Sequence, residues 1–300
     1  MSLSFAALSA TELALLAADK PILGSNAIPI SPIPVFAWSD TGDWVSHVAS
    51  GYPESRIYDG RGDLWTKPDQ PLNTWMLQID ASAAPMEFDF LAIIGNNFAT
   101  SLPTISLDIS NTSNWSGALS IPIATPTTNA RLLTLSLKHT GTAPLRYTGV
   151  PYARIVFTNA ITMTPNVGEV IFGRRRQLAH RSDRPYDSLA QIGTATQLTT
   201  QGGILSKHAY AMGARKLRAS WVEWETPYVT DLPAWWANIG YGARTFIWIE
   251  APSSAPTSFN LMMPDSDDFN FPIEDCIERH FMLEGTEQGP QSYYLNRGIY

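Results

Sequence analysis

The sequence contains a single cysteine, Cys276, and few charged residues for its length. One cysteine can form neither an internal disulfide framework nor a cysteine-ligated zinc site, so neither is expected to stabilise the fold. A lone thiol is also consistent with synthesis in a reducing cytosol. Charged residues make up 16% of the chain and hydrophobic residues 44%. That balance is typical of packed cores and not of intrinsic disorder.

Long hydrophobic runs are also missing. The apolar N-terminal stretch SLSFAALSATELALLAADKP has no basic residues before it, and Glu12 interrupts it, so an export signal is not predicted. No stretch approaches the length that spans a bilayer, so no membrane contact is expected. Ser9 as an N-cap, with Glu12 three residues later, instead forms a capping box and predicts a short helix that stops at Pro21.

The chain has fewer basic than acidic residues. The net charge is −7 at pH 7, which argues against attraction of the whole protein to nucleic acid or to an anionic membrane. We therefore expect no nucleic-acid partner.

Catalytic motifs are absent as well: there is no nucleophile elbow, zinc-protease motif, Walker loop or dinucleotide fingerprint. A glycan-cleaving enzyme would need two carboxylates facing one cleft, and no spacing selects such a pair. Asp265, Asp267 and Asp268 have calcium-like spacing, but the loop lacks the glycine and glutamate of an EF-hand and is interpreted as a turn. We expect a non-enzymatic protein without metal or cofactor.

The sequence is rich in short strand-like runs bounded by turn residues, which predicts antiparallel β-sandwiches. The segment 27–38 contains three prolines and is expected at a sheet edge. Trp75, Leu77 and Ile79 alternate along 73–81, the period of a half-buried strand. The runs in the first half are 73–81, 88–98, 104–115, 130–139, 152–160 and 168–173.

In the second half, 203–225 is predicted to be a hairpin that bends at Met212–Ala214. The segment 228–240 is a helix candidate, with Thr230 or Asp231 as its cap and Gly240 as its end. Three strands are expected at 243–251, 257–264 and 277–285, and the domain boundary at 174–200, where hydrophobicity falls.

Five arginines lie within eleven positions after the strand Glu169–Phe172, an unusual density in an acidic chain. Binding of single-stranded nucleic acid would require interleaved aromatic residues, and only Phe172 and Tyr186 flank the segment. Arginine favours bidentate ion pairs at protein interfaces, so we interpret the segment as a docking junction between domains, with a solvated linker as the alternative.

The ten tryptophans raise the possibility of carbohydrate binding, because sugars stack their apolar faces on aromatic rings. Trp38, Trp44, Trp65 and Trp115 are the candidates; cores and interfaces also use tryptophan and are the favoured explanation. Trp235 and Trp236 are adjacent on the predicted helix and so point about 100° apart. One is expected to pack inward and the other to face a partner.

Two segments, EFDFLAIIGNNFATSLPTISLDISNTSNW and YARIVFTNAITMTPNVGEVIFG, together resemble galactose-binding-like (discoidin-type) jelly rolls. In that pattern an apolar strand ends in Gly-x-Asn and the closing strand carries Gly-Glu-Val. Such domains occur in minor structural proteins of tailed-phage virions. The continuation GRRRQLAHRSDRPYD with RKLRASWVEWE is similar to β-sandwich modules of tail-tip and distal-tail components. The resemblance covers roughly residues 30–285, but the tip-loop residues of sugar-binding members are not identifiable.

The prediction is a mainly β protein with an N-terminal helical arm (1–25), a galactose-binding-like jelly roll (26–175) and a second β-sandwich domain with one short helix (176–300). The resemblance implies a structural component of a virion, tail-associated and made in the host bacterial cytoplasm. Its partners are expected to be copies of itself and other virion proteins. A receptor-binding module for a host surface glycan and a capsid decoration protein are the alternatives. The expected interface residues are Arg174, Arg175, Arg176, Arg181, Arg184, Tyr186, Trp235 and Trp236. Replacing residues 174–176 with alanine is expected to block assembly and leave the fold intact.

Overall fold

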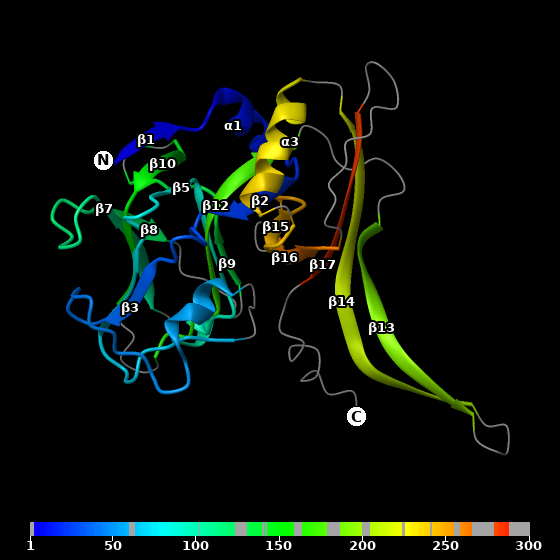
Figure 1. Ribbon diagram of the computed structural model, residues 1–300, viewed down its shortest axis with the longest axis horizontal. Helices are drawn as coiled ribbons and strands as arrows, with labels where there is room; N and C mark the ends of the chain where they lie inside the picture. Colours follow the sequence, from blue (N-terminus) through cyan, green and yellow to red (C-terminus); the bar gives the residue numbers. More distant parts are fainter. Residues whose placement is uncertain are drawn as a thin grey trace. The chain divides into compact units, whose positions relative to one another are not determined.

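The structure is a computed structural model, and it confirms a mainly β protein with several antiparallel sheets (Figure 1). It describes residues 3–59, 64–101, 103–123, 131–139, 141, 143–158, 164–178, 187–199, 205–223, 226–240, 242–254, 259–265 and 279–287. The chain divides into two compact units. Unit 1 comprises Met1–Ala179 and Ile247–Phe259, and unit 2 comprises His180–Phe246 and Asn260–Tyr300. The segment 247–259, which the sequence placed in the second domain, thus belongs with the first.

Unit 1 contains three groups of strands. The first is a three-stranded sheet in the order β1 (Ser4–Ala7), β10 (Leu145–Val150), β5 (Met86–Phe88). The second has five strands in the order β3 (Val35–Ser39), β4 (Thr74–Asp80), β11 (Tyr152–Thr158), β7 (Thr104–Ser110), β8 (Leu119–Ile123). In the third, the order is β15 (Phe246–Ile249), β2 (Ile22–Asn26), β12 (Glu169–Gln177), β6 (Phe90–Ile94), β9 (Arg131–Thr134). The proline-rich segment leads into β3, which lies at a sheet edge as predicted.

The hydrophobic core of unit 1 takes side chains from all three groups of strands. Trp75, Leu77 and Ile79 of β4 are buried together in the core, as predicted, but the strand is not half-buried, because Met76 and Gln78 on its other face are buried as well. Every residue of β6 is buried, as its continuous apolar run predicts. The same core includes Phe88, Tyr147, Leu91 and Phe172.

The helical elements of unit 1 are short. Helix α1 (Ala10–Ala17) begins with the predicted capping box: Ser9 Oγ accepts from the Glu12 amide at 3.1 Å, and Glu12 Oε2 accepts from the Ser9 amide at 2.9 Å. These two bonds satisfy amide groups that an open helix end would leave without partners. The others are η1, a 3-10 helix (Glu54–Tyr58), and α2 (Phe98–Ser101).

The glycine that closes the GEVIFG segment is required by packing. A Cβ atom on Gly173 of β12 would lie 1.9 Å from the ring of Phe90, and one on Gly24 of β2 would lie 2.6 Å from the same ring. The Phe90 ring therefore lies across two adjacent strands at positions where neither has a side chain. Alanine at either position would force the ring or the backbone to move.

Unit 2 contains strands in the order β13 (Asp187–Thr199), β14 (Leu205–Glu223), β17 (Arg279–Glu287), β16 (Phe259–Pro264). The predicted bend at Met212–Ala214 is wrong, because residues 205–223 form one continuous strand. Gln191 pairs with Arg215 and Gly193 with Met212, so two residues of β14 lie opposite one residue of β13. The glycine marks a β-bulge and not a turn, which is the usual meaning of an isolated glycine within a strand.

The predicted helix of unit 2 is present but begins earlier than expected. Helix α3 spans Thr226–Asn238, so Pro227, and not Thr230 or Asp231, marks its first turn. The helix stops before Gly240, whose φ of 63° lies in the left-handed region, as the predicted end requires.

Candidate functional site

The first three arginines of the basic segment lie in the middle of a sheet, inside β12. Arg174, Arg175 and Arg176 pair with Ser25, Gly24 and Leu23 of β2. Because side chains alternate along a strand, Arg175 points to the opposite face from its two neighbours. Arg181, Arg184 and Tyr186 lie outside the described residues.

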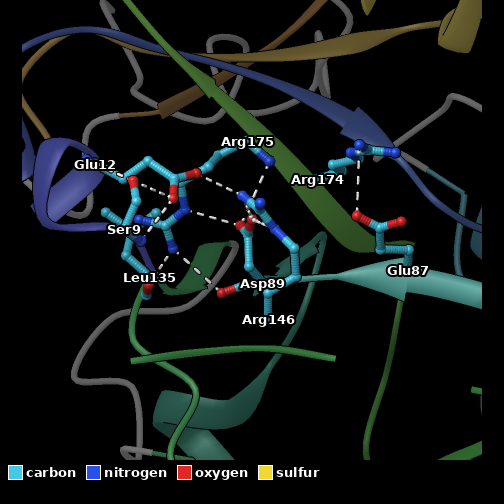
Figure 2. A network of polar contacts seen from close by, with 8 residues as sticks. All are labelled: Ser9, Glu12, Glu87, Asp89, Leu135, Arg146, Arg174 and Arg175. Carbon is cyan, nitrogen blue, oxygen red and sulfur yellow. Dashed lines mark hydrogen bonds and ion pairs between the residues drawn. The ribbon is translucent and has the colours of Figure 1, made fainter. Parts of the chain in front are cut away.

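Arg175 forms a buried ion pair with Asp89 (Figure 2). Its Nε donates to Asp89 Oδ1 at 2.8 Å, and Nη2 donates to the carbonyl oxygens of Asp89, at 3.2 Å, and Leu135. The Asp89 side chain is fully buried and Arg175 is only 1% exposed. An arginine in this position is part of the interior, so the prediction that it faces a neighbouring protein is wrong.

A second arginine joins the pair to the N-terminal segment. Arg146 of β10 donates to Asp89 Oδ2 from Nε at 3.1 Å and from Nη2 at 2.9 Å, and Nη2 also donates to Glu12 Oε1 at 2.6 Å. Figure 2 shows Asp89 between the two guanidinium groups. The four charged groups are two cations and two anions, so the cluster, which we call the arginine network, is neutral overall.

The network shifts the pKa of Glu12 and that of Arg146. Burial alone would raise the pKa of Glu12, but hydrogen bonds from the Ser9 amide and hydroxyl and the charge of Arg146 outweigh it, so that pKa lies below its ordinary value. Burial alone would lower the pKa of Arg146; Asp89 and then Glu12 reverse the effect and raise it. The network therefore holds α1 against β10 and β12 and has a structural role.

The other two arginines of β12 are more exposed. Arg174 Nη2 lies 3.4 Å from Glu87 Oε1, and both side chains are about one-third exposed (32% and 34%). Arg176 is half-buried. Replacing all three arginines with alanine would remove Arg175 from the buried Asp89 and is expected to destabilise the fold by about 3–5 kcal/mol, so that variant cannot separate assembly from folding.

The tryptophans of the predicted helix are both buried, at 0% exposure for Trp235 and 7% for Trp236. Leu232 and Ile239 are buried as well, and the four positions form the stripe i, i+3, i+4, i+7 of a helix. An apolar stripe of that width accommodates two side chains that point 100° apart. The prediction that one of the two faces a partner is therefore wrong.

The four carbohydrate candidates separate into three groups. Trp38 is completely buried and its Nε1 donates to Thr66 Oγ1 at 2.9 Å, so the prediction that it contacts sugar is wrong. Trp65 is 42% exposed. Trp44 and Trp115 are half-buried and come together from two loops, with ring centroids 6.1 Å apart and planes inclined by 21°.

Trp115 also contacts polar residues on the outward face of the five-stranded sheet. Its indole lies over the Arg154 guanidinium, 4.3 Å from the ring centroid, and its Nε1 donates to Gln78 Oε1 at 2.7 Å. Arg154 Nε donates to Asp108 Oδ2 at 2.9 Å. We call Trp44, Trp115, Gln78, Arg154 and Asp108 the aromatic face. The sequence reasoning missed its three polar members.

The alternation of side chains along each strand could have identified these three polar residues. Gln78, Asp108 and Arg154 each interrupt an apolar run at a position opposite to the buried residues. That they form one row follows from register: Gln78 and Asp108 both pair with Arg154, from β4 and β7. Single-strand patterns do not specify which strands are neighbours.

The β13–β14 hairpin is the second unusual feature. Only Lys216–Glu223 of β14 pairs with β17, so among the described residues Leu205–Arg215 pairs with β13 alone. At about 3.3 Å per residue, this two-stranded part extends for roughly 35 Å. Figure 1 shows it as a long ribbon.

Comparisons with known proteins do not identify the chain: no family model, curated protein or solved structure gives a significant match. The resemblance to galactose-binding-like jelly rolls and phage tail components thus stays a prediction.

In the described part of the chain, no helix combines the length and apolarity needed to cross a membrane. The same residues contain no group of three or more potential metal ligands. Of the three aspartates with calcium-like spacing, Asp267 and Asp268 are outside that part.

Proposed function

We propose that this protein is a non-enzymatic structural component of a phage virion, associated with the tail and made in the host bacterial cytoplasm. It works through contacts with copies of itself and with other virion proteins. Under this proposal unit 1 is the galactose-binding-like jelly roll with its N-terminal arm, and unit 2 is the second β-sandwich domain. The observation that supports it best is the β13–β14 hairpin.

A two-stranded antiparallel ribbon is at most marginally stable in water without further packing. The outer edge of β13 ends the strand order of its sheet, so its backbone groups face no further strand among the described residues. A ribbon of about 35 Å gains stability when a neighbouring subunit covers it. An assembly contact supplies that cover.

The charge of the hairpin favours an acidic partner. The two strands carry four basic residues and two acidic ones in a chain whose net charge is −7. A basic segment on an acidic protein attracts another copy of the same protein. The basic residues are Lys207, Arg215, Lys216 and Arg218, and the acidic ones are Asp187 and Glu223.

The irregular register of the hairpin favours a defined contact over open-ended aggregation. The pairing shifts at three places, between Asp187 and Ala190, Gln191 and Gly193, and Thr194 and Ala195. Bulges twist a strand edge and oppose the addition of arbitrary strands. A partner must match this shape to bind.

The first test is the number of copies per particle, measured by quantitative mass spectrometry of purified virions. Few copies, in multiples of three or six, support the tail assignment, because a closed ring contains a fixed small number of subunits. Copies on the order of hundreds would replace it with capsid decoration, because a large closed shell repeats each of its sites many times. Absence from particles would overturn the virion proposal.

The second test removes the hairpin. Residues 192–214 are replaced by Asn-Gly, which joins the paired residues Gln191 and Arg215 by a two-residue turn. We expect the variant to fold with an unchanged urea midpoint for unit 1 and to be missing from particles. E87A, a surface change in unit 1, is the control and should be incorporated normally. Incorporation of the shortened variant would exclude the hairpin as the assembly contact.

A further inference from the structure

The outward face of the five-stranded sheet has features of a binding site that the assembly role does not use. One row of residues crosses all five strands in register: Ala37, Gln78, Arg154, Asp108 and Ser120. Their chain neighbours Leu77, Ile155 and Leu107 point into the core. Four of the five side chains are polar, and the row lies on the face of the sheet that is turned away from the core.

The polar groups of the row are held in place but not fully used. Arg154 engages Asp108 through Nε only; within the described residues its Nη1 and Nη2 groups have no hydrogen-bond partner, and neither does Asp108 Oδ1. Both side chains are partly exposed, at 18% and 11%. The site thus presents up to four N–H donors of a planar guanidinium beside a carboxylate acceptor.

Aromatic rings border these groups. Trp44 and Trp115 lie nearly parallel, and Tyr152, on the same sheet face as Arg154, has its ring centroid 6.1 Å from that of Trp44. Both indoles are anchored at their polar ends, since Trp44 Nε1 donates to Ser113 O at 3.2 Å and Trp115 Nε1 donates to Gln78. Anchored rings lose little freedom when a ligand stacks on them.

The two loops that carry the rings are shaped for this arrangement. Trp115 has a φ of 62°, in the left-handed region that large side chains rarely adopt. Gly42 has a φ of 87°, and a Cβ there would lie 3.2 Å from Arg154 Nη1. Backbone strain at a non-glycine residue is typical of functional sites.

We propose that the aromatic face binds a neutral saccharide. Sugar hydroxyls both donate and accept, which matches an adjacent Arg154 and Asp108, and the apolar face of a sugar ring stacks on indole. Two further aspartates lie beside the row: the Asp43 carbonyl oxygen accepts from Gln78 Nε2, and Asp80 is two residues from Gln78 on the same face of β4. Together with Asp108 they place three carboxylates near the row, which disfavours nucleic acid and other anionic ligands. This activity is additional to the proposed assembly role.

The test uses the purified full-length chain and the methyl glycosides of glucose, galactose, mannose and N-acetylglucosamine, with sialyllactose as an anionic probe. Saturation-transfer NMR detects binding, and tryptophan fluorescence gives the affinity. We expect at least one neutral glycoside to bind, and W44A and R154Q to weaken it by about tenfold or more. W65A, which removes the exposed tryptophan that does not contact the row, is the matched control and should bind like the unmodified protein.

Three results would overturn the proposal: no neutral glycoside binds, only sialyllactose binds, or W65A loses as much affinity as W44A. Urea unfolding of each variant shows whether it is folded. If R154Q does not fold, W44A decides, because Trp44 lies in a loop and is partly exposed. The measurement does not depend on particles, so it can fail or succeed independently of the assembly proposal.

Discussion

Unit 1 contains two arginine–aspartate pairs with nearly the same local geometry and different surroundings. Arg175 Nε lies 2.8 Å from Asp89 Oδ1, and Arg154 Nε lies 2.9 Å from Asp108 Oδ2. The first pair has no exposed side-chain surface, whereas the second is 18% and 11% exposed. The difference lies in the remaining nitrogens. Nη2 of Arg175 donates to two carbonyl oxygens and its Nη1 is buried, whereas the terminal nitrogens of Arg154 lie beside an aromatic ring on a partly exposed side chain.

The comparison shows that an arginine in a sequence does not by itself indicate a surface. A buried guanidinium must be paired, because an unpaired buried charge costs several kcal/mol. Arg175 meets that requirement with Asp89, and so it fixes structure. The Arg154 side chain is held by Asp108 and is still 18% exposed, which allows the ligand contact that we propose. The exposure of the pair distinguishes the two roles.

The largest expected effect is that of D89A. It removes the carboxylate shared by Arg175 and Arg146 and leaves two cations with Glu12 alone. We expect the free energy of unfolding to fall by about 3–5 kcal/mol, as when one partner of a buried pair is lost. Urea denaturation followed by tryptophan fluorescence measures it. A loss of less than about 1 kcal/mol would contradict the structural role of the network.

D108A is expected to cost less, about 1–2 kcal/mol, because Arg154 can be partly solvated when its partner is removed. The same urea experiment compares it with D89A. An equal cost for the two variants would remove the distinction between the pairs. D108A should also reduce glycoside binding. D89A should not reduce it when binding is measured at a urea concentration below the unfolding transition, where this variant is still folded.

The sequence could predict the features of the fold that depend on a local pattern, and not those that depend on contacts between distant residues. Periodicity was sufficient for the strands at 73–81 and 152–160, and the Ser9–Glu12 spacing was sufficient for the cap of α1. Arg175 was misassigned because its partner, Asp89, is 86 residues away. Burial of an arginine depends on a contact of that range, which no local pattern contains. Trp38 was misassigned for the same reason, since Thr66 lies across the fold.

The row of polar residues in the aromatic face could not be predicted from the sequence, because it depends on which strands pair and in which register. Trp44 and Trp115 were both identified as candidates, but nothing in either loop predicts that they meet. The hairpin predicted within 203–225 is wrong, because these residues form a single strand that pairs with β13. The bend was placed at Gly213 because glycine is frequent in both turns and bulges. The pairing of β13 with β14 decides between the two, and it involves a strand that the sequence reasoning treated as the domain boundary.

A smaller effect is expected from acid, through Glu12. Its pKa lies below the ordinary value of 4.5, so the ionised form stabilises the folded state. That contribution is present above about pH 4.5 and is lost as the pH falls through the lower, folded-state pKa. We expect hydrogen-exchange protection of the Glu12 and Leu13 amides, corrected for intrinsic rates, to fall in this range. In E12Q the protection should be lower at neutral pH and should not change with acid. Protection of the unmodified protein that stays constant as the pH is lowered step by step through the folded-state pKa would contradict the prediction.

The smallest effect is expected for E87A, which removes the partner of Arg174. Arg174 is the chain neighbour of Arg175 on β12, and Glu87 lies two residues before Asp89, so the two pairs are close together in the fold. The Arg174 and Glu87 side chains are about one-third exposed, however, and water can replace the lost carboxylate. We expect a change in unfolding free energy of at most about 0.5–1 kcal/mol, measured beside D89A. A cost above about 2 kcal/mol would show that position in the sheet, and not burial, decides what an arginine of β12 contributes.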